Sequence, residues 1–542
     1  MQLGAASNFS QGWSDRIWRA ALDLPLPRLR DSIRWEQVER TPGLYVFDKP
    51  TTTWPDRFAR SGTPITLTLN WGNPLYDDGK TPHSPQALAA FGRFAAAVVR
   101  RFPQIDTLEI GNEINGNNFV SGPVRNAGLA RRGQYHLAMV RAAARAVHRV
   151  RPGIKVLGGS THSLPAGFLW PLLDLSGAGA IEGLALHPYT TPIDQLPGQI
   201  GLLRRNGTLA RLPLSITEFG SQDARHAADD LVRGYAVLAA LGVSEMDWYP
   251  LNPRGDGMIP LVRRDGSLTD TGKAFRFVQA RMAGLPARDD SPDPFTSIRR
   301  FGSKIAVIWG APRRITVDPG NVSVFDATGA RLDTRNLILH ERRVLVLIGT
   351  RPLKTAQLVH LGCSRLLADS FHQFGYPLPG ARQAAGDGFE RYVRVGSHAL
   401  PFEVMPGQQR RGVPWTPYLG RRGMRDLRLT ADTILPAVEG GNGAVVHHYA
   451  TGRDLRVHLL AEFSVSPRST DGVAMTLSRN GHDVLTRSGN APITVDLHLN
   501  LRRGQALSLS LAPGTSARGD ITRYRIRILD ESRCAENAPP NS

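Results

Sequence analysis

The stretch that decides the fold reads Leu108-Glu109-Ile110-Gly111-Asn112-Glu113-Ile114-Asn115. It begins as an apolar strand and turns into a polar loop rich in Gly and Asn, at the point where Glu113 follows Asn112. A parallel (β/α) barrel carries its catalytic groups at the carboxyl ends of its strands, so this pattern is typical of a catalytic carboxylate. Taken alone, the stretch is also compatible with a helix-capping or ion-paired glutamate.

The sequence on both sides of this stretch, from the N-terminus to about residue 286, alternates apolar strands with helical segments, as βαβ units do. Strands are expected at residues 3–8, 32–35, 65–71, 108–112, 154–159, 181–189, 214–219 and 243–249, with helices at 14–24, 84–101, 132–150 and 271–282. Eight strands in this length predict a TIM barrel, for which about 250 residues are typical. The alternative is a doubly wound sheet, which usually has a Gly-rich phosphate turn after its first strand, and none is seen here.

The sequence pattern changes after residue 286, where short β-type runs are separated by turns rich in Pro and Gly. We therefore predict an α/β fold with a (β/α)8 barrel at residues 1–286, followed by all-β regions. A small β module packed on the barrel is expected at 287–354, a β-sandwich or jelly roll at 355–532, and a disordered tail at 533–542. Four aromatic residues of the sandwich either bind sugar or belong to its core: Phe371, Tyr376, Trp415 and Tyr418.

Polar and aromatic residues follow the predicted barrel strands at their carboxyl ends. These residues are Arg34, Asn70, Trp71, Asn112, Glu113, His187, Tyr189, Glu218 and Trp248. Two glutamates on different strands, Glu113 and Glu218, form the pair that glycoside cleavage requires. One carboxyl protonates the glycosidic oxygen while the other attacks the anomeric carbon, from about 5–5.5 Å away in retaining enzymes.

The combination resembles clan A retaining glycoside hydrolases, most closely the family 39-like members, over about residues 1–285. It rests on Asn112-Glu113 after strand four and on Glu218 in Ile216-Thr217-Glu218-Phe219-Gly220 after strand seven. The segment from Trp35 to Phe47 is also similar to the clan's W-x-x-x-E-x-x-x-G-x-Y-x-F pattern. The resemblance implies that Glu113 is the general acid/base and Glu218 the nucleophile. It further implies that the substrate is a β-linked polysaccharide, such as a bacterial exopolysaccharide of the kind found in biofilms.

The resemblance also suggests roles for the neighbours of the two glutamates. Arg34 is similar to the clan's strand-two arginine, which would keep Glu218 ionised; a surface salt bridge is the alternative. Asn112 would bond the sugar 2-hydroxyl, or else is a turn residue. Glu218, once negative, would raise the pKa of Glu113 so that it carries the proton.

The remaining candidates are weaker. Tyr189 would orient Glu218, and His187 would bind a hydroxyl unless it is a core histidine. Trp248 would be the platform under the reacting sugar, with ordinary packing as the alternative. Asn70 and Trp71 are further substrate-binding candidates. Glu109 faces inward four residues before Glu113 and is interpreted as a structural carboxylate.

The composition limits the possible binding partners and the cellular location of the protein. The formal charge is +19, but only six of the 66 basic residues are Lys, and the Arg residues are scattered along the whole chain, so no nucleic-acid partner is expected. If the charge has a role, an acidic polysaccharide is the expected target. No apolar run approaches the ~20 residues of a membrane span, and no signal peptide opens the chain. We expect a monomer that is periplasmic or secreted, its signal peptide being absent from this sequence, with the cytoplasm as the alternative.

No metal or cofactor is expected, because the chain has no HExxH motif and no clustered Cys. Cys363 and Cys534 form either one disulfide or two buried thiols. Three functions compete: a retaining glycosidase, a glycan-binding protein without catalysis, and a polyanion-binding protein. The presence of both glutamates favours the first.

Overall fold

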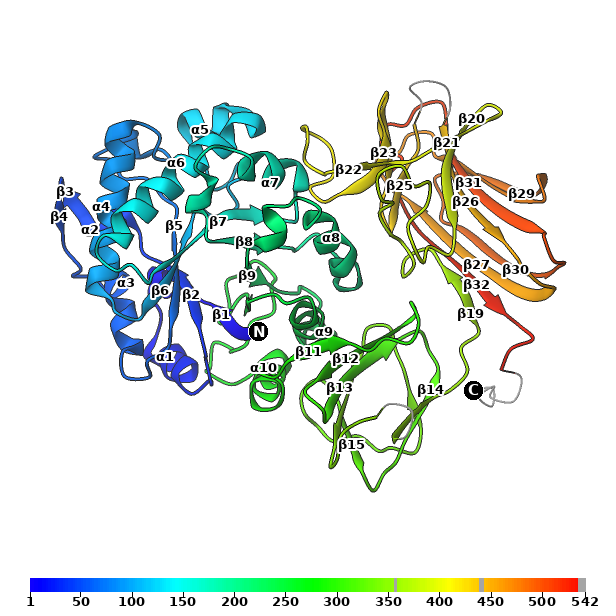
Figure 1. The fold of residues 1–542 in the computed structure, drawn as a ribbon, viewed down its shortest axis with the longest axis horizontal. Helices are drawn as coiled ribbons and strands as arrows, with labels where there is room; N and C mark the ends of the chain where they lie inside the picture. Colours follow the sequence, from blue (N-terminus) through cyan, green and yellow to red (C-terminus); the bar gives the residue numbers. More distant parts are fainter. Residues whose placement is uncertain (355–357, 438–442, 535–542) are drawn as a thin grey trace.

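The computed structural model describes residues 1–354, 358–437 and 443–534, and it confirms the predicted barrel followed by β-rich regions (Figure 1). Eight parallel strands close into a barrel in the order β1-β10-β9-β8-β7-β6-β5-β2. Their bounds are β1 Gln2–Ala6, β2 Leu29–Ser32, β5 Ile65–Leu69, β6 Ile105–Ile110, β7 Lys155–His162, β8 Gly183–His187, β9 Leu214–Phe219 and β10 Glu245–Trp248. Most of the predicted C-terminal tail, residues 535–542, lies outside the described residues.

Helices cover the outside of the barrel. The longer ones are α1 Asp15–Leu22, α4 Pro85–Arg101, α6 Gly128–His148, α7 Ala166–Leu173, α8 Leu196–Leu203, α9 Ala227–Ala240 and α10 Asp270–Arg281, and the short ones are α2 Trp35–Val38, α3 Pro50–Thr53 and α5 Gly122–Asn126. α4 shows why they form: the Ser84 hydroxyl accepts a 3.1 Å hydrogen bond from the Ala87 amide, and Pro85 occupies the first turn. Its apolar side chains then recur at helical spacing and are buried against the barrel.

The segment that follows β2 makes a tight corner built on Glu39. The Glu39 carboxylate accepts hydrogen bonds from Trp35 Nε1 at 2.5 Å, the Gly43 amide at 2.7 Å and the Tyr76 hydroxyl at 2.8 Å. These bonds join α2 to the hairpin of β3 (Glu39–Thr41) and β4 (Leu44–Tyr45). The predicted W-x-x-x-E pattern is therefore a structural corner beside the barrel mouth.

The small β module contains two sheets. The larger has the order β11-β12-β13-β17-β15, and the smaller has the order β16-β14-β18. The bounds are β11 Ala287–Asp289, β12 Thr296–Phe301, β13 Ile305–Gly310, β14 Arg314–Val317, β15 Val322–Phe325, β16 Leu337–Ile338, β17 Leu345–Gly349 and β18 Val359–Leu361. Because β18 pairs with β14, the module reaches Leu361, and the predicted boundary at residue 354 was too early.

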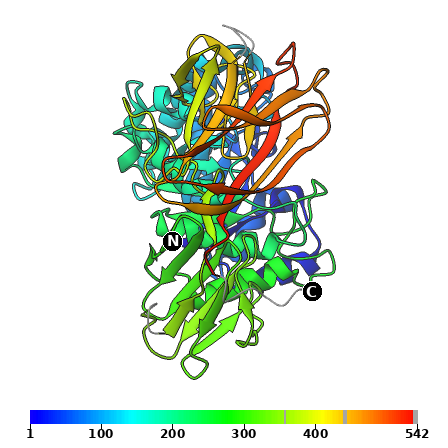
Figure 2. The ribbon, with the colours of Figure 1, turned by 90° about the vertical axis from the view of Figure 1, so that its right-hand side faces the viewer.

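The C-terminal region packs two antiparallel sheets face to face. One has the order β22-β23-β24-β25-β32-β27-β30, with β19 also paired to β32, and the other has the order β21-β20-β26-β31-β28-β29. The bounds are β19 Leu366–Asp369, β20 Glu390–Val395, β21 His398–Pro401, β22 Glu403–Met405, β23 Tyr418–Arg421, β24 Met424–Leu429, β25 Thr433–Leu435, β26 Gly443–Ala450, β27 Leu455–Val465, β28 Val473–Arg479, β29 His482–Gly489, β30 Ile493–Leu501, β31 Ala506–Pro513 and β32 Thr522–Asp530. Alternate residues of β27 are buried between the sheets, as a sandwich requires. Seen from the side in Figure 2, the sandwich lies above the small module and the barrel lies behind both.

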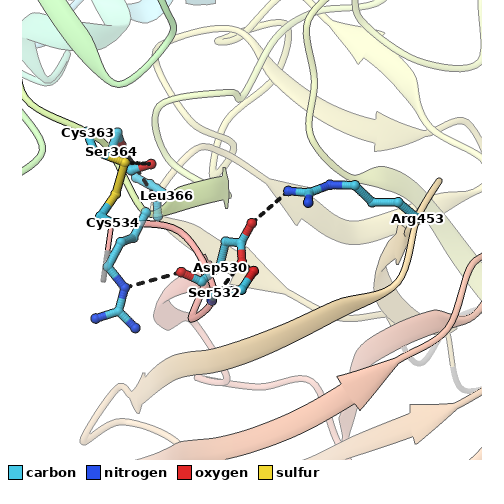
Figure 3. Close-up of a disulfide and its surroundings, with 8 residues drawn as sticks. Cys363, Ser364, Leu366, Arg453, Asp530, Ser532 and Cys534 are labelled. Atoms are coloured by element: carbon cyan, nitrogen blue, oxygen red, sulfur yellow. Dashed lines mark hydrogen bonds and ion pairs between the residues drawn. A yellow bond between two sulfur atoms is a disulfide. The ribbon is translucent and has the colours of Figure 1, made fainter. Parts of the chain in front are cut away.

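Cys363 and Cys534 are joined in a disulfide, which decides between the two alternatives left open by the sequence (Figure 3). The bond ties the chain just before β19 to the segment just after β32, where Arg365 Nε also donates to the Asp530 carbonyl at 3.2 Å. The disulfide therefore links the two ends of the sandwich, where the chain enters it and where the chain leaves it. In the described part of the chain, every helix is too short or too polar to serve as a membrane span.

Candidate active site

Glu113 and Glu218 meet at the carboxyl end of the barrel. Glu113 follows β6 and Glu218 lies near the end of β9, and a carboxylate oxygen of one lies within 4.8 Å of a carboxylate oxygen of the other. Their side chains are 17% and 12% exposed, so both are largely shielded from water but open to the barrel mouth. Two carboxylates this close on different strands can act on one bond, as the pair of a retaining glycosidase does with carboxyls about 5–5.5 Å apart.

The backbone turns sharply to present Glu113. Gly111 has φ of 84° and Glu113 itself has φ of 43°, a left-handed conformation that a glutamate rarely adopts. The turn is held from two sides: the Asn112 amide donates to Asn70 Oδ1 at 3.0 Å, and the Ile114 amide donates to the Ser160 carbonyl at 3.0 Å. Strain of this kind persists only where neighbours enforce it, and it is common at active sites.

The arginine that pairs with Glu218 is Arg30 and not Arg34. Arg30 Nη1 forms a short ion pair with Glu218 Oε1, its Nε donates to Glu109 Oε2 at 2.8 Å, and its Nη2 donates to Asn112 Oδ1 at 2.8 Å. The prediction for Arg34 was wrong because β2 ends at Ser32, before Arg34. Arg34 instead lies over the Trp71 ring at 4.6 Å and pairs with Glu36 at 3.6 Å.

Glu109 is a structural carboxylate in the barrel interior, as its position predicts. It is fully buried and lies between Arg30 and His187. Burial alone would raise the pKa of Glu109, but the charge of Arg30 and the hydrogen bond with His187 lower it to about 2. It therefore stays charged and fixes the two cationic groups beneath the glutamate pair.

His187 lies between all three carboxylates and is completely buried. Its Nε2 lies 3.3 Å from Glu109 Oε1, and its Nδ1 lies 3.4 Å from Glu113 Oε1 and 3.8 Å from Glu218 Oε2. Burial alone would lower the pKa of His187, but the three surrounding carboxylates raise it to about 9. Its ring is enclosed by protein, so the prediction that it binds a substrate hydroxyl gives way to a role in holding the charges of the pair.

The pKa of Glu113 is lowered, contrary to the prediction that Glu218 raises it. Burial works to raise the pKa of Glu113, but hydrogen bonds with His162 and His187 outweigh it and hold the pKa well below the usual range. His162 Nδ1 lies 3.0 Å from Glu113 Oε1. The two histidines were not part of the predicted charge balance, which considered only the like charge of Glu218.

Tyr189 contacts Glu218 directly: its hydroxyl donates a 2.9 Å hydrogen bond to Glu218 Oε2. This bond and the Arg30 ion pair engage both carboxylate oxygens of Glu218. The Tyr189 ring lies 6.5 Å from the ring of Tyr249 and 6.0 Å from that of His162. Tyr189 thus orients the carboxylate and forms part of an aromatic rim around it.

Two further candidates do not face a substrate. Trp248 is fully buried, and its Nε1 donates to the Ile259 carbonyl at 2.9 Å, so the prediction of a sugar platform was wrong and the alternative of ordinary packing holds. Asn70 is 2% exposed, and its amide nitrogen donates to the Phe119 carbonyl at 3.1 Å. Because its oxygen accepts a hydrogen bond from the Asn112 amide, both ends of the Asn70 side chain support the loop that carries Glu113. Trp71 is half-buried under Arg34 at the edge of the site.

The sequence reasoning missed Arg30 and His162. Arg30 and Ser32 are two residues apart on β2, and side chains two residues apart point to the same face of a strand. Arg30 is therefore expected on the inner face once the end of the strand is set at Ser32. His162 was missed because the predicted strand stopped at residue 159. β7 in fact passes through a kink at Gly159 and Ser160, whose φ values are 80° and 43°, and continues to His162.

The sandwich aromatics divide into two kinds. Tyr376 and Tyr418 are buried, with hydroxyls bonded to the Pro417 carbonyl at 2.8 Å and Gln409 Nε2 at 2.5 Å, so they belong to the core and its edge. Phe371 is half-buried at a cavity beside the barrel. Trp415 is 37% exposed.

No family model matches the chain, and no curated protein matches it. The structure is similar to a family 39 glycoside hydrolase from the gut symbiont Bacteroides cellulosilyticus WH2, with a TM-score of 0.53 and 18% identity over 64% of this chain and 81% of that one. This likeness shows the fold. Less similar are a family 30 endoxylanase from Clostridium papyrosolvens C71 (TM-score 0.48, 13% identity, 64% and 96% covered) and a family 39 β-xylosidase from Caulobacter crescentus (0.46, 17%, 65% and 96%).

Proposed function

We propose that the chain is a retaining β-glycosidase that cleaves a polysaccharide by double displacement through Glu113 and Glu218. The observation that carries the proposal is the placement of the two carboxylates, on β6 and β9 of a barrel, with oxygens within 4.8 Å of each other. The similar fold of a family 39 glycoside hydrolase supports it. Both glutamates are oriented by specific partners, which a glycan-binding protein without catalysis does not need.

In the first step Glu218 attacks the anomeric carbon and the leaving oxygen takes a proton from Glu113. Arg30 and Tyr189 fix the two oxygens of Glu218, so the nucleophile is already aligned before substrate arrives. We assign the contact with the sugar 2-hydroxyl, which strengthens in the transition state, to Asn112, whose Oδ1 accepts a hydrogen bond from Arg30 Nη2.

The proton for Glu113 comes from the cluster itself. The raised pKa of His187 keeps a proton on that ring, while the pKa of Glu113 is lowered. His187 Nδ1 is 3.4 Å from Glu113 Oε1, so a proton can pass between them with little movement of the heavy atoms. Substrate binding excludes water and removes solvation from the Glu113 carboxylate, which favours its protonated form.

In the second step Glu113 acts as base toward water, which attacks the glycosyl ester on Glu218. Esterification removes the negative charge of Glu218, the largest of the charge effects that raise the pKa of His187. While the ester exists, the cluster carries one negative charge fewer, and the weaker repulsion favours the ionised form of Glu113 that acts as base. The charge of Glu218 returns when the ester is hydrolysed.

We infer an extended and partly acidic polysaccharide, such as a bacterial exopolysaccharide, as substrate. The formal charge of +19 supports an acidic target. A cavity of about 420 Å³ lies where barrel, small module and sandwich meet, next to Tyr189, and Arg342 and Arg525 are among its lining residues. It offers room for further sugars of the chain, but both arginines are paired with carboxylates, Arg342 with Asp223 and Arg525 with Glu341, so the support for an acidic target rests on the formal charge.

The experiment is a screen of the full chain on β-1,4-xylan, β-1,4-mannan, β-1,3-glucan, the acidic polymer β-1,4-polymannuronate and crude bacterial exopolysaccharide. The wild type is expected to release reducing ends from at least one, with the β-anomer as the first product by proton NMR. Glu113→Gln and Glu218→Gln are expected to lose at least a thousandfold in rate, with Gln37→Glu as a remote charge control. An α-anomer as first product excludes the retaining mechanism, and binding without product for every polymer favours the glycan-binding function. Binding to all polyanions alike, falling steeply with salt, favours the polyanion-binding function.

We further propose that the protein is exported to the periplasm or beyond and acts as a monomer. The Cys363–Cys534 disulfide supports export, because such bonds persist in oxidising compartments. Thiol labelling of protein isolated from periplasm and cytoplasm under denaturing conditions tests the location, and light scattering tests the oligomeric state.

A further inference from the structure

A loop of the sandwich reaches the candidate active site. It comprises residues 406–417 and connects β22 to β23, the part of the sandwich that lies nearest α7 in Figure 1. Gln408 of this loop is 6% exposed and makes two hydrogen bonds to Asn115: Asn115 Nδ2 donates to Gln408 Oε1 at 2.7 Å, and Gln408 Nε2 donates to the Asn115 carbonyl at 3.2 Å. Asn115 is two residues from Glu113, so the loop is fastened to the catalytic turn itself.

A second attachment joins the loop to α7 of the barrel. The Gly167 amide donates to the carbonyls of Pro406 and Gly407, both at 3.1 Å. A Cβ at Gly167 would lie 2.3 Å from the Gly407 oxygen, closer than real contacts allow. Gly167 is therefore required for the loop to approach α7 this closely, and the loop has a fixed position relative to the barrel.

These attachments bring Trp415 to the side of the site where Glu113 lies. The Trp415 ring meets the His162 ring edge to face, with centroids 5.0 Å apart, and His162 in turn contacts Glu113 at 3.0 Å. On its other side the Trp415 ring borders Gly116, where a Cβ would lie 3.5 Å from Trp415 Cη2. With 37% of its surface exposed, Trp415 presents a free aromatic surface beside the acid/base.

We propose that loop 406–417 completes the active site and that Trp415 is the platform for the sugar on the leaving-group side of the scissile bond. This rests on the proposed function. Glu113 protonates the leaving oxygen, so a surface next to Glu113 and His162 suits the leaving sugar, whereas Arg30 and Tyr189 bond directly to the nucleophile Glu218. A large apolar ring in this position suits the apolar face of a pyranose.

The proposal predicts that changes at Trp415 affect kcat/KM differently for two kinds of substrate. A tetrasaccharide has a sugar in the leaving-group position and uses Trp415, whereas a glycosyl fluoride of the same sugar has none. Trp415→Ala is expected to lower kcat/KM about tenfold or more for the best-cleaved tetrasaccharide among those of β-1,4-xylose, β-1,4-mannose, β-1,3-glucose and β-1,4-mannuronate, and less than twofold for the fluoride. Trp415→Phe is expected to restore most of the loss. Val484→Ala, on the exposed β29, is the control for an apolar truncation elsewhere in the sandwich.

A matched pair of glycine variants tests the role of the loop without altering any group in the site. Gly167→Ala pushes the loop away from α7 and is expected to reproduce the selective loss seen with Trp415→Ala. Gly201→Ala, on α8, has nothing within 4 Å of the added carbon and is expected to leave both substrates unaffected. Thermal unfolding midpoints check that each variant is folded.

Binding without turnover is measured in the Glu113→Gln variant. N-bromosuccinimide oxidises exposed tryptophan, and peptide mass spectrometry follows the oxidation of Trp415. A tetrasaccharide that binds is expected to protect Trp415 at least threefold. Three results would overturn the proposal but leave the glycosidase function standing. The first is that Trp415→Ala lowers kcat/KM equally for the tetrasaccharide and the fluoride, and the second is that it lowers neither. The third is that calorimetry shows tetrasaccharide binding without protection of Trp415. If the wild type cleaves none of the panel but a tetrasaccharide binds, the glycosidase function fails and protection still decides the role of Trp415. If nothing is cleaved or bound, both are contradicted.

Discussion

The imidazole Nδ1 of His187 lies 3.4 Å from Oε1 of Glu113, inside a barrel where the ring is completely buried. The contact links Glu113 to a cationic group that also faces Glu109 and Glu218. The site is thus a charge cluster in which Arg30 and His187 oppose three carboxylates. Its behaviour follows from how protons and charges are shared among these five groups.

The first prediction concerns pH and stability. The pKa of His187 rises from 6.5 to about 9 on folding, so its charged form stabilises the fold fully below pH 6.5 and this contribution is lost as pH rises through 9. A shift of this size corresponds to about 3 kcal/mol. The free energy of unfolding from urea titrations at pH 6 and pH 10 is expected to fall by about that much more in the wild type than in His187→Gln. Identical pH dependence in the two proteins would show that His187 is not charged in the fold.

The second prediction separates the two arginines. Arg30→Met leaves Glu109 and Glu218 buried without their cation, which is expected to cost about 3–5 kcal/mol of stability and at least a hundredfold in kcat. Arg34→Met removes a side chain that lies on Trp71 at the edge of the site, and is expected to change kcat less than threefold. Denaturant titration and steady-state kinetics measure both. Comparable losses in kcat for the two variants would restore the role first assigned to Arg34.

The third prediction concerns the hydroxyl of Tyr189. Tyr189→Phe removes one hydrogen bond to the charged Glu218, worth about 1.5–3 kcal/mol, and is expected to lower kcat about 10- to 100-fold with little change in the unfolding midpoint. Tyr235→Phe is the control, because that hydroxyl donates to the Met1 carbonyl at 3.0 Å, away from the site. If both variants keep wild-type kcat, Tyr189 does not orient the nucleophile.

The fourth prediction concerns the disulfide. It spans 171 residues, and closing a loop of this length is expected to stabilise the sandwich by about 5 kcal/mol through the entropy of the unfolded chain. The double variant Cys363→Ser and Cys534→Ser is expected to unfold its sandwich at a lower denaturant concentration, and reducing agent is expected to shift the wild type but not the variant. Superimposable curves for oxidised and reduced wild type would contradict this.

Sequence reasoning located the barrel and both glutamates because each depends on local patterns: apolar strands of the right length, followed by a carboxylate at the strand end. It failed where one strand end was misplaced. Moving the end of the second strand from Trp35 back to Ser32 exchanges Arg34 for Arg30 as the partner of Glu218. His162 lies beyond a kink in β7 that apolar periodicity does not reveal.

Other features depend on packing between distant segments and leave no local trace. Trp248 is at a strand end, as predicted, but its side chain is enclosed by the segment that carries Ile259. Trp415 reaches the site from a distant part of the sequence, through the contact of Gln408 with Asn115, which are 293 positions apart. The lowered pKa of Glu113 likewise follows from two histidines that the fold brings together from β7 and β8.

Trapping the glycosyl ester on Glu218 tests the double-displacement mechanism. In Glu113→Ala the first step still proceeds with a glycosyl fluoride, whose leaving group needs little protonation, but the second step lacks its base. Intact mass and peptide mapping are expected to show one added glycosyl group, carried by Glu218, and azide is expected to release it as a β-glycosyl azide. A wild type that cleaves the same sugar while no ester forms on Glu218, with an α-anomer as its first product, would contradict the account.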